Sequence, residues 1–353
     1  MAKIDELLRT LVAQQGSDLH LKSGEPPIYR INGQLVRTSL PVLTPEETKS
    51  LMYEILNDER RERYEKTHQL DMSYSIPGVS RFRVNVFRQK NSIGAVLRVI
   101  PLQIKSIDEL GLPTSMKKVC LLPRGLILVT GPTGSGKSTS LAAMIDLIND
   151  NKSCHIITIE DPIEFLHRDK RACVNQREVG IDTHSFANAL KHVMRQNPDI
   201  IMVGEMRDLE TLSLAITAAE TGHLVMATLH TADASQTVDR IIDVFPPGQQ
   251  QQVRLQLSTT LQAVFSQTLL PRNDGQGRIV AYEVLICTPA IRSIVREGKT
   301  HQLYSNIQSG AKYGMITLDA NLKDQYLKGL VNLEDAIAKS SNPQELEKLL
   351  GKV

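Results

Sequence analysis

The sequence predicts an α/β protein with two parts, a small N-terminal α+β domain and a larger C-terminal domain built on a parallel sheet. Beyond residue 124, short apolar runs alternate with segments of helical periodicity, which is typical of strand–helix–strand units with parallel strands. Before residue 101, short strands and helices are separated by turn signals without that alternation. A chain of 353 residues has room for two or three domains.

We assign residues 1–100 to the N-terminal domain, 101–123 to a linker carrying a short helix, and 124–353 to the C-terminal domain. A helix is expected near 4–13, and a second one after Thr44, which is followed by a proline and two acids. The expected strands are 19–21, 27–31 and 34–36, with Asn32-Gly33 as the turn before the last, then 70–75, and 81–87 continuing to 93–100.

The C-terminal domain is expected to begin with buried strands and to end in helices. Its predicted strands are 126–129, 155–159, 200–203 and 224–229, and a tail of helices is predicted from about residue 249. In open α/β sheets, ligands bind at the carboxyl ends of the strands. The residues that follow each strand are therefore the first candidates for a functional site.

Composition and charge exclude several classes of protein. The formal net charge is +2, which argues against a protein that coats nucleic acid. The four cysteines form no C-x-x-C pair, so we expect reduced thiols and no zinc site. No run of eighteen apolar residues suggests a membrane-spanning helix, and the first twenty residues lack the apolar core of a signal peptide.

The stretch GLILVTGPTGSGKSTSLAAMID joins an apolar run to a helical pattern through a glycine-rich turn. Gly131, Gly136, Lys137 and Ser138 fill the spacing G-x-x-x-x-G-K-[ST] of a P-loop. In such a loop, backbone amides and the helix N-terminus hold phosphate, the lysine reaches the β- and γ-phosphates, and the serine hydroxyl ligates Mg²⁺. The predicted ATP-binding residues are Thr133, Gly134, Ser135, Gly136, Lys137, Ser138 and Thr139.

Carboxylates follow two of the later predicted strands. Glu160, Asp161 and Glu164 come directly after one apolar run, where they could hold a metal–water shell, act as a general base, or form a solvated acidic turn. Gly204-Glu205 ends the next strand, at the position where many nucleoside triphosphatases carry an aspartate that orients Mg²⁺ through water. We predict Ser138 and Glu205 as the Mg²⁺ residues.

Histidines and arginines supply further candidates. His223 precedes the strand at 224–229 and His230 ends it, so the pair could sense the γ-phosphate, or could be surface histidines. Arg81, Arg83 and Arg98 lie on predicted strands of the N-terminal domain, and the first two share one face. Such arginines are usually solvated or paired with acids, but in a ring-shaped nucleoside triphosphatase they could donate charge to phosphate.

Several motifs taken together resemble the secretion-superfamily ATPases of type II secretion and type IV pili. These are GPTGSGKSTSLAAMID, TIEDPIEFLH, VNQREVG, DIIMVGEMRDLETL, AAETGHLVMATLHT and VDRIIDVFP. The segments SDLHLKSGEPPIYRINGQL, AIRSIVREGKTHQLYS and GMITLD narrow the resemblance to the retraction ATPases of type IV pili. The resemblance covers nearly the whole chain.

The resemblance implies a homohexameric ATPase with an N-terminal PAS-like domain, a C-terminal RecA-like domain, and ATP bound between them. It places Glu160 and Glu164 in an acidic box, with Glu164 as the first choice for polarising the attacking water, and His223 and His230 in a histidine box. Glu205 would hold Mg²⁺ and share the base role, and the three arginines would approach the phosphates. It also implies a cytoplasmic position at the inner membrane, where an inner-membrane platform protein of the pilus machinery would be the partner.

Three other functions remain open at this point, one of them a nucleotide-dependent scaffold that does not hydrolyse ATP and that an ATPase assay would identify. A pilus assembly or type II secretion ATPase belongs to the same family, but such ATPases are typically longer, and many carry a tetracysteine zinc module. A RecA-like DNA motor would present a basic DNA-facing surface, which the near-neutral charge does not favour.

Overall fold

The computed structural model describes residues 3–31, 33–100, 103–275 and 277–351, and the chain divides into two compact units. The first unit comprises residues 1–103 and 162–166, and the second comprises 104–161 and 167–353. The segment that we predicted as a linker contains helix α4 (Thr114–Cys120), and from residue 104 onward it belongs to the second unit. Met116 and Cys120 are fully buried there, so this segment is part of a core rather than a free connection.

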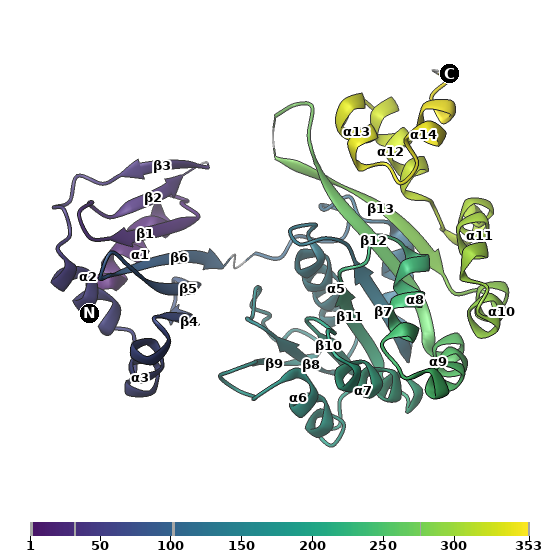
Figure 1. Ribbon diagram of the computed structural model, residues 1–353, viewed down its shortest axis with the longest axis horizontal. Helices are drawn as coiled ribbons and strands as arrows, with labels where there is room; N and C mark the ends of the chain where they lie inside the picture. Colours follow the sequence, from purple (N-terminus) through teal and green to yellow (C-terminus); the bar gives the residue numbers. More distant parts are fainter. Residues whose placement is uncertain (1–2, 32, 101–102, 276, 352–353) are drawn as a thin grey trace. The chain divides into compact units, whose positions relative to one another are not determined.

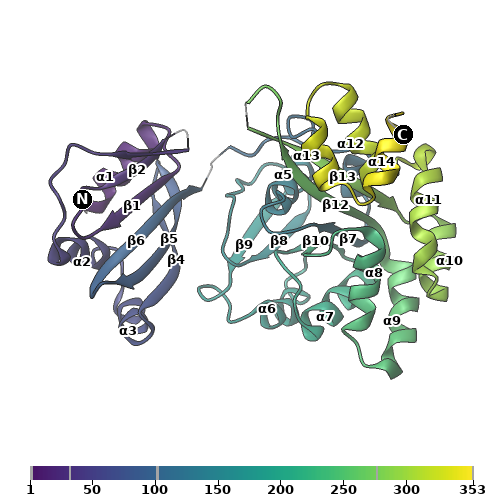
Figure 2. The same cartoon turned by 45° about the horizontal axis from the view of Figure 1, so that its top comes forward.

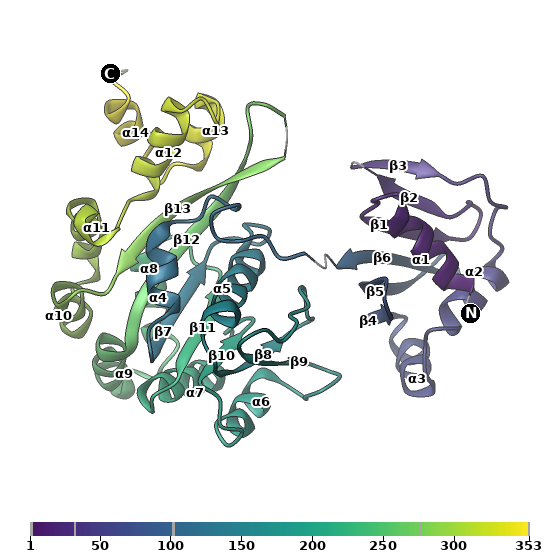
Figure 3. The ribbon, with the colours of Figure 1, turned by 180° about the vertical axis from the view of Figure 1, so that it is seen from behind.

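The first unit is an antiparallel sheet with helices packed on it (Figure 3). Within the described residues the sheet has six strands in the order β3-β2-β1-β6-β5-β4. Its elements are α1 (Lys3–Ala13), β1 (Asp18–Lys22), β2 (Ile28–Ile31), β3 (Gln34–Arg37), α2 (Pro45–Tyr53), α3 (Asp58–Thr67), β4 (Gln69–Ile76), β5 (Ser80–Gln89) and β6 (Ser92–Ile100).

Local sequence signals account for several of these elements. Helix α2 begins with the predicted cap: the Thr44 hydroxyl accepts a hydrogen bond from the amide of Glu47 at 3.2 Å, and the Glu47 carboxylate accepts one from the Thr44 amide at 2.8 Å. The predicted turn at Asn32 falls outside the described residues, although β2 and β3 pair antiparallel on either side of it.

The predicted continuation of one strand from 81–87 to 93–100 is wrong. β5 and β6 are separate antiparallel strands, joined at Lys90 and Asn91, whose φ angles are 45° and 59°. A hairpin turn with two left-handed residues usually contains glycine. This turn contains none, so the sequence did not predict a hairpin here. Helix α3 was not predicted either.

The second unit is a sheet covered by helices on both faces. Among the described residues this larger sheet has seven strands in the order β13-β12-β7-β11-β10-β8-β9, parallel except for β13. The elements of its first part are β7 (Gly125–Thr130), α5 (Lys137–Asn151), β8 (His155–Glu160), β9 (Cys173–Glu178), α6 (Phe186–Val193), β10 (Ile200–Val203), α7 (Leu209–Glu220) and β11 (Leu224–Leu229).

Alternate residues of each central strand pack on opposite faces of the larger sheet. Leu126 and Leu128 of β7 contact the layer of α6 and α7, whereas Ile127 and Val129 contact the layer of α4 and α5. Figure 2 shows α6 and α7 on one side of the sheet and α5 on the other. The strands are buried on both sides, which explains why each one appears in the sequence as an uninterrupted apolar run. The four strands predicted here are all present, and β9, which carries more polar residues, was not predicted.

The predicted helical tail from residue 249 begins correctly with a helix but is wrong over residues 261–286. After α8 (Ala234–Asp243) and α9 (Pro247–Thr260), the chain forms two long strands, β12 (Leu261–Pro271) and β13 (Arg278–Ile286). β12 follows α9 without a glycine or proline, so the sequence carries no break there, and its strand conformation depends on parallel pairing with β7. Helices follow: α10 (Pro289–Glu297), α11 (Leu303–Ser309), α12 (Leu318–Leu327), α13 (Leu333–Lys339) and α14 (Pro343–Leu349), and the last three share a small core with β12 and β13 (Figure 1).

No helix among the described residues is both long enough and apolar enough to cross a membrane.

Candidate active site

The P-loop joins the end of β7 to the start of α5, as its pattern predicts. Gly131 has a φ of 136°, and a Cβ at this position would lie 2.2 Å from the backbone oxygen of Gln267 on β12. Gly136 has a φ of 90° and forms the left-handed N-cap of α5. Both positions require glycine, because a side chain would clash with β12 or strain the backbone. The loop turns tightly into the amino end of a fifteen-residue helix, where backbone amides can hold an anion.

The lysine of the loop is buried and already oriented. Its side chain is 9 % exposed, and its Nζ donates hydrogen bonds to the carbonyl oxygens of Gly131 at 2.8 Å and Pro132 at 3.1 Å. The Ser135 hydroxyl is also buried, and it finds no hydrogen-bond partner within the described part of the chain. A buried cation and a buried hydroxyl without a partner among the described residues, both beside the amino end of α5, fit a phosphate group, so the loop supports the predicted nucleotide site.

Glu160 ends β8 and is held by neighbours on the same edge of the sheet. It is buried, and its Oε1 accepts hydrogen bonds from the Thr158 hydroxyl at 2.6 Å and from the Gln176 amide of β9 at 3.0 Å. Gln176 belongs to the VNQREVG segment, to which the sequence gave no chemical role. Its contact with Glu160 assigns that segment to the acidic edge of the site.

Glu205 follows β10, the strand beside β8. The amide of Gly204 donates to the oxygen of Ile159 at 2.8 Å, and a Cβ on Gly204 would lie 3.2 Å from that same oxygen, so this glycine allows the two strand ends to approach. The Glu205 Oε1 lies 2.7 Å from Nε2 of His230 and accepts from Nε of Arg207 at 2.6 Å. Burial opposes ionisation of Glu205, but the Arg207 and His230 contacts outweigh it and lower its pKa from the ordinary value.

The two histidines do not meet. His230 follows the carboxyl end of β11 and contacts Glu205, as predicted. His223 precedes the amino end of the same strand, where its backbone oxygen accepts from the amide of Gly125 at the start of β7 and its Nδ1 lies 2.9 Å from the oxygen of Ala218. The two ends of an extended strand of six residues lie roughly 20 Å apart. Within this chain, His223 therefore lies at the edge of the sheet opposite to the P-loop. The prediction that both histidines face the carboxylates is wrong.

The three predicted arginines share one face of the smaller sheet. Arg81 and Arg83 alternate along β5 with the buried Phe82, and Arg83 pairs directly across the sheet with Arg98 of β6. Arg81 donates to the Ser73 hydroxyl at 2.7 Å. The Arg83 side chain makes no hydrogen bond or ion pair with another described residue, although its backbone is part of the sheet.

Arg98 has a structural contact that its sequence position did not reveal. Its Nε donates to Oδ1 of the buried Asp18 at 2.8 Å. Burial disfavours the charged carboxylate, but hydrogen bonds from Ser17 and Arg98 hold the pKa of Asp18 below its ordinary value. Arg98 therefore stabilises the first unit through Asp18, whether or not it also contacts phosphate.

Glu164, the first choice for polarising water, is exposed in the segment 162–166 that belongs to the first unit. Asp161 is also exposed. Their predicted roles stay predictions, as do those of the three arginines.

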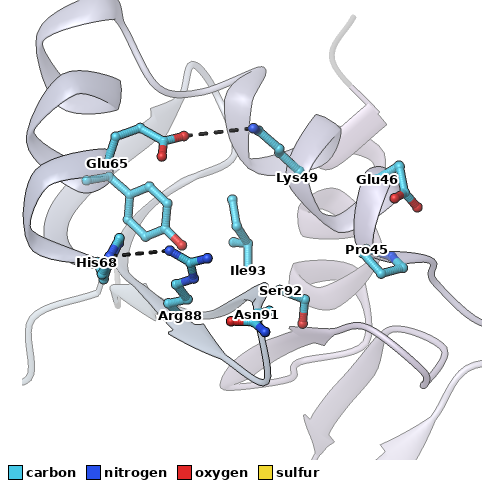
Figure 4. A pocket seen from close by; sticks show the side chains of 10 residues that line it. Pro45, Glu46, Lys49, Glu65, His68, Arg88, Asn91, Ser92 and Ile93 are labelled. Atoms are coloured by element: carbon cyan, nitrogen blue, oxygen red, sulfur yellow. Dashed lines mark hydrogen bonds and ion pairs between the residues drawn. The ribbon is translucent and has the colours of Figure 1, made fainter.

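The first unit also contains a cavity of about 240 Å³ that none of the predicted site residues lines (Figure 4). Two contacts join side chains that line it: Lys49 Nζ lies 3.8 Å from Glu65, and Arg88 lies 3.3 Å from Nε2 of His68.

The predicted Mg²⁺ residues offer suitable donors. Ser138 is the second residue of α5 and supplies a hydroxyl oxygen, and Glu205 supplies a carboxylate whose ionised form is favoured. Oxygen donors of this kind are what Mg²⁺ prefers, with water in the remaining positions. The residues present therefore fit a magnesium ion held with the nucleotide.

A parallel sheet with a P-loop after one strand and carboxylates at the ends of two others defines the class of P-loop nucleoside triphosphatases. Comparison with known proteins gives the family. The model of the type II/IV secretion system protein family matches residues 1–338, and this chain belongs to that family.

Its relatives include pilus retraction proteins. It is 52% identical to the type IV pilus retraction ATPase PilT of Pseudomonas aeruginosa over 97% of this chain and 99% of that protein. It is 47% identical to a twitching motility protein of Neisseria gonorrhoeae over 96% of this chain and 91% of the relative. A crystal structure of the pilus retraction motor PilT with bound ADP superposes with a TM-score of 0.92 at 49% identity, covering 99% of both chains. The fold is therefore the RecA-like fold of the secretion ATPases, and the chain is an ATP hydrolase.

Proposed function

We propose that this chain is the motor that powers retraction of type IV pili by hydrolysing MgATP as a homohexamer. The observation that carries the proposal is the agreement with a retraction ATPase over the whole length of both chains, together with an intact P-loop and Glu205–His230 pair. An ATPase of pilus assembly or type II secretion is the alternative within the family.

Hydrolysis is an in-line attack of water on the γ-phosphorus, which breaks the bond to the β-phosphate oxygen and yields ADP and phosphate. The P-loop amides hold the phosphates, and Lys137 neutralises charge that develops on them. Bound Mg²⁺ supplies further positive charge at the phosphates, with Ser138 and Glu205 as its protein residues. Glu164, which follows Glu160 by four residues in the acidic box, polarises the attacking water.

The remaining residues stabilise charge. His230 orients the Glu205 carboxylate through the 2.7 Å contact and senses whether the γ-phosphate is present. Arg81, Arg83 and Arg98 supply positive charge to the phosphates. Release of the γ-phosphate removes these contacts and switches a subunit between discrete arrangements, and its neighbours in the ring respond through shared interfaces. The force passes to a platform protein of the inner membrane, at its cytoplasmic face.

A test of this function uses the living cell and the purified protein together. Cells lacking the gene should extend pili that fail to shorten, wild-type protein should restore shortening, and Lys137→Ala should not. Cells without any pili would instead indicate an assembly ATPase. If the purified protein stays monomeric and does not hydrolyse MgATP, the motor proposal is wrong.

The purified protein also allows a nucleic-acid motor to be distinguished from a pilus motor, by measuring ATP hydrolysis with and without DNA. ATP hydrolysis by a DNA motor rises when DNA is added, because such motors couple turnover to movement on the strand. We expect the hydrolysis rate to be unchanged by single- or double-stranded DNA.

A further inference from the structure

Gln267 of β12 lies beneath the P-loop and is almost fully buried at 3 % exposure. Its Nε2 donates to the backbone oxygen of Ser135 at 2.8 Å, and its Oε1 accepts from the Ser140 hydroxyl at 2.9 Å. One side chain from a strand more than 120 residues away therefore joins the phosphate-binding loop to the first turn of α5.

We propose that Gln267 is a positioning residue of the nucleotide site, which fixes the direction in which the P-loop amides point. The inference rests on the P-loop being the site of the nucleotide phosphates. Gln267 does not touch the nucleotide in this account; it acts through the loop backbone.

The planarity of the peptide bond explains how Gln267 can orient an amide that it does not touch. In a trans peptide, the carbonyl oxygen and the N–H of the next residue point in opposite directions. Because Gln267 holds the oxygen of Ser135 toward β12, the N–H of Gly136 must point the other way, toward the hollow of the loop. Gly136 is left-handed and has no side chain to hold its own orientation, so this peptide would rotate more freely without the contact.

The packing of β12 against the loop supports the same conclusion. The backbone oxygen of Gln267 occupies the space that a Cβ on Gly131 would need, and Nε2 of Gln267 lies 3.2 Å from the Cβ position of Gly136. Next to it, the Thr130 hydroxyl donates to the Ser266 hydroxyl at 2.9 Å in a buried pair. β12 therefore contacts the last residue of β7, the middle of the loop and the first turn of α5.

The amide side chain meets both demands of this position. The Ser135 carbonyl needs a donor and the Ser140 hydroxyl needs an acceptor, and both groups are buried. A buried polar group that loses its partner is costly, so the loop would rearrange to satisfy Ser135 elsewhere. That rearrangement turns the Gly136 amide and weakens phosphate binding.

Calorimetric binding of MgADP to the Gln267→Met variant tests the inference. Methionine has the same length but neither donor nor acceptor, and volume-conserving changes are the best tolerated in cores. We expect the Kd for MgADP to rise about tenfold, which corresponds to about 1.4 kcal/mol. Gln325→Met is the matched control, because Gln325 is also a buried glutamine that donates to a backbone oxygen, that of Val280 at 2.6 Å, but on α12.

The control separates positioning from general stabilisation. Both variants should melt at a lower temperature than the wild type, but only Gln267→Met should change the Kd; a Kd within twofold of the wild type in Gln267→Met overturns the inference. If that variant does not fold, Ser140→Ala must raise the Kd about threefold, and an unchanged value there overturns the inference equally. Lys137→Ala is measured alongside: if it too binds MgADP like the wild type, the P-loop is not the nucleotide site and the proposed function itself fails.

Discussion

Replacing Lys137 by alanine should nearly abolish ATP hydrolysis while leaving the fold intact. The ammonium group is largely buried and is held by hydrogen bonds at 2.8 and 3.1 Å to two loop carbonyls, so it is already oriented when nucleotide arrives. A charge-assisted hydrogen bond in such a place contributes about 1.5–3 kcal/mol. Two of them to phosphate oxygens in the transition state amount to about 3–6 kcal/mol, a fall in kcat of roughly 10²–10⁴.

The effect of the same change on stability should be small. The variant loses two hydrogen bonds from a charged donor, about 3–6 kcal/mol in total. It also no longer buries an ammonium group, and the desolvation cost that this saves offsets much of the loss, so the melting temperature should fall by only a few degrees. Lys152→Ala is the matched control, because Lys152 caps the other end of α5 and donates to the oxygen of Leu122 at 2.9 Å. Phosphate release under saturating MgATP is the assay, with thermal melts for both variants.

Comparing kcat of the two variants shows whether Lys137 itself stabilises the transition state. We expect Lys152→Ala to hydrolyse ATP within about twofold of the wild type, since no phosphate chemistry depends on it. If Lys137→Ala keeps more than a tenth of the wild-type kcat, or if both variants lose activity equally, the lysine does not stabilise the transition state and the mechanism is refuted.

Three more changes test two other residues of the site and one buried residue outside it. Glu205→Gln keeps the size of the side chain but removes its charge, so kcat should fall at least 100-fold in the phosphate-release assay while MgADP binding changes less than tenfold; equal losses in both would contradict a role in catalysis. Arg83→Ala removes a side chain that contacts no other described side chain through a hydrogen bond or ion pair, so it should lower kcat more than it weakens MgADP binding and leave the melting temperature unchanged; an unaltered kcat would mean that Arg83 is an ordinary surface charge. Burial raises the pKa of Glu283 on β13 from 4.5 to about 7, so the stability associated with its protonated form is present below pH 4.5 and is lost as pH rises to about 7. At pH 8, Glu283→Gln should therefore be more stable than the wild type by about 3 kcal/mol, with little difference at pH 4.5, and parallel melting curves at both pH values would refute this assignment.

Parts of the candidate site could be predicted from the sequence because its key residues lie next to the strands that position them. The P-loop, Glu160 and Glu205 each follow an apolar run directly, and parallel strands bring their carboxyl ends to one edge. His223 shows the limit of this reasoning. It is adjacent in sequence to the same strand as His230, but it lies at the opposite end, and only the direction of the strand separates the two.

The sequence alone determined the elements whose signals are local. The cap of α2, the buried strands β7, β8, β10 and β11, and the phosphate-binding loop each depend on residues within a few positions of one another, where backbone conformation and hydrophobic period act directly. Tertiary structure decided the rest. β12 became a strand by pairing with β7, and Gln267 reached the P-loop through that pairing, because hydrogen bonds between distant segments depend on how the sheet is assembled and leave no pattern in either segment alone.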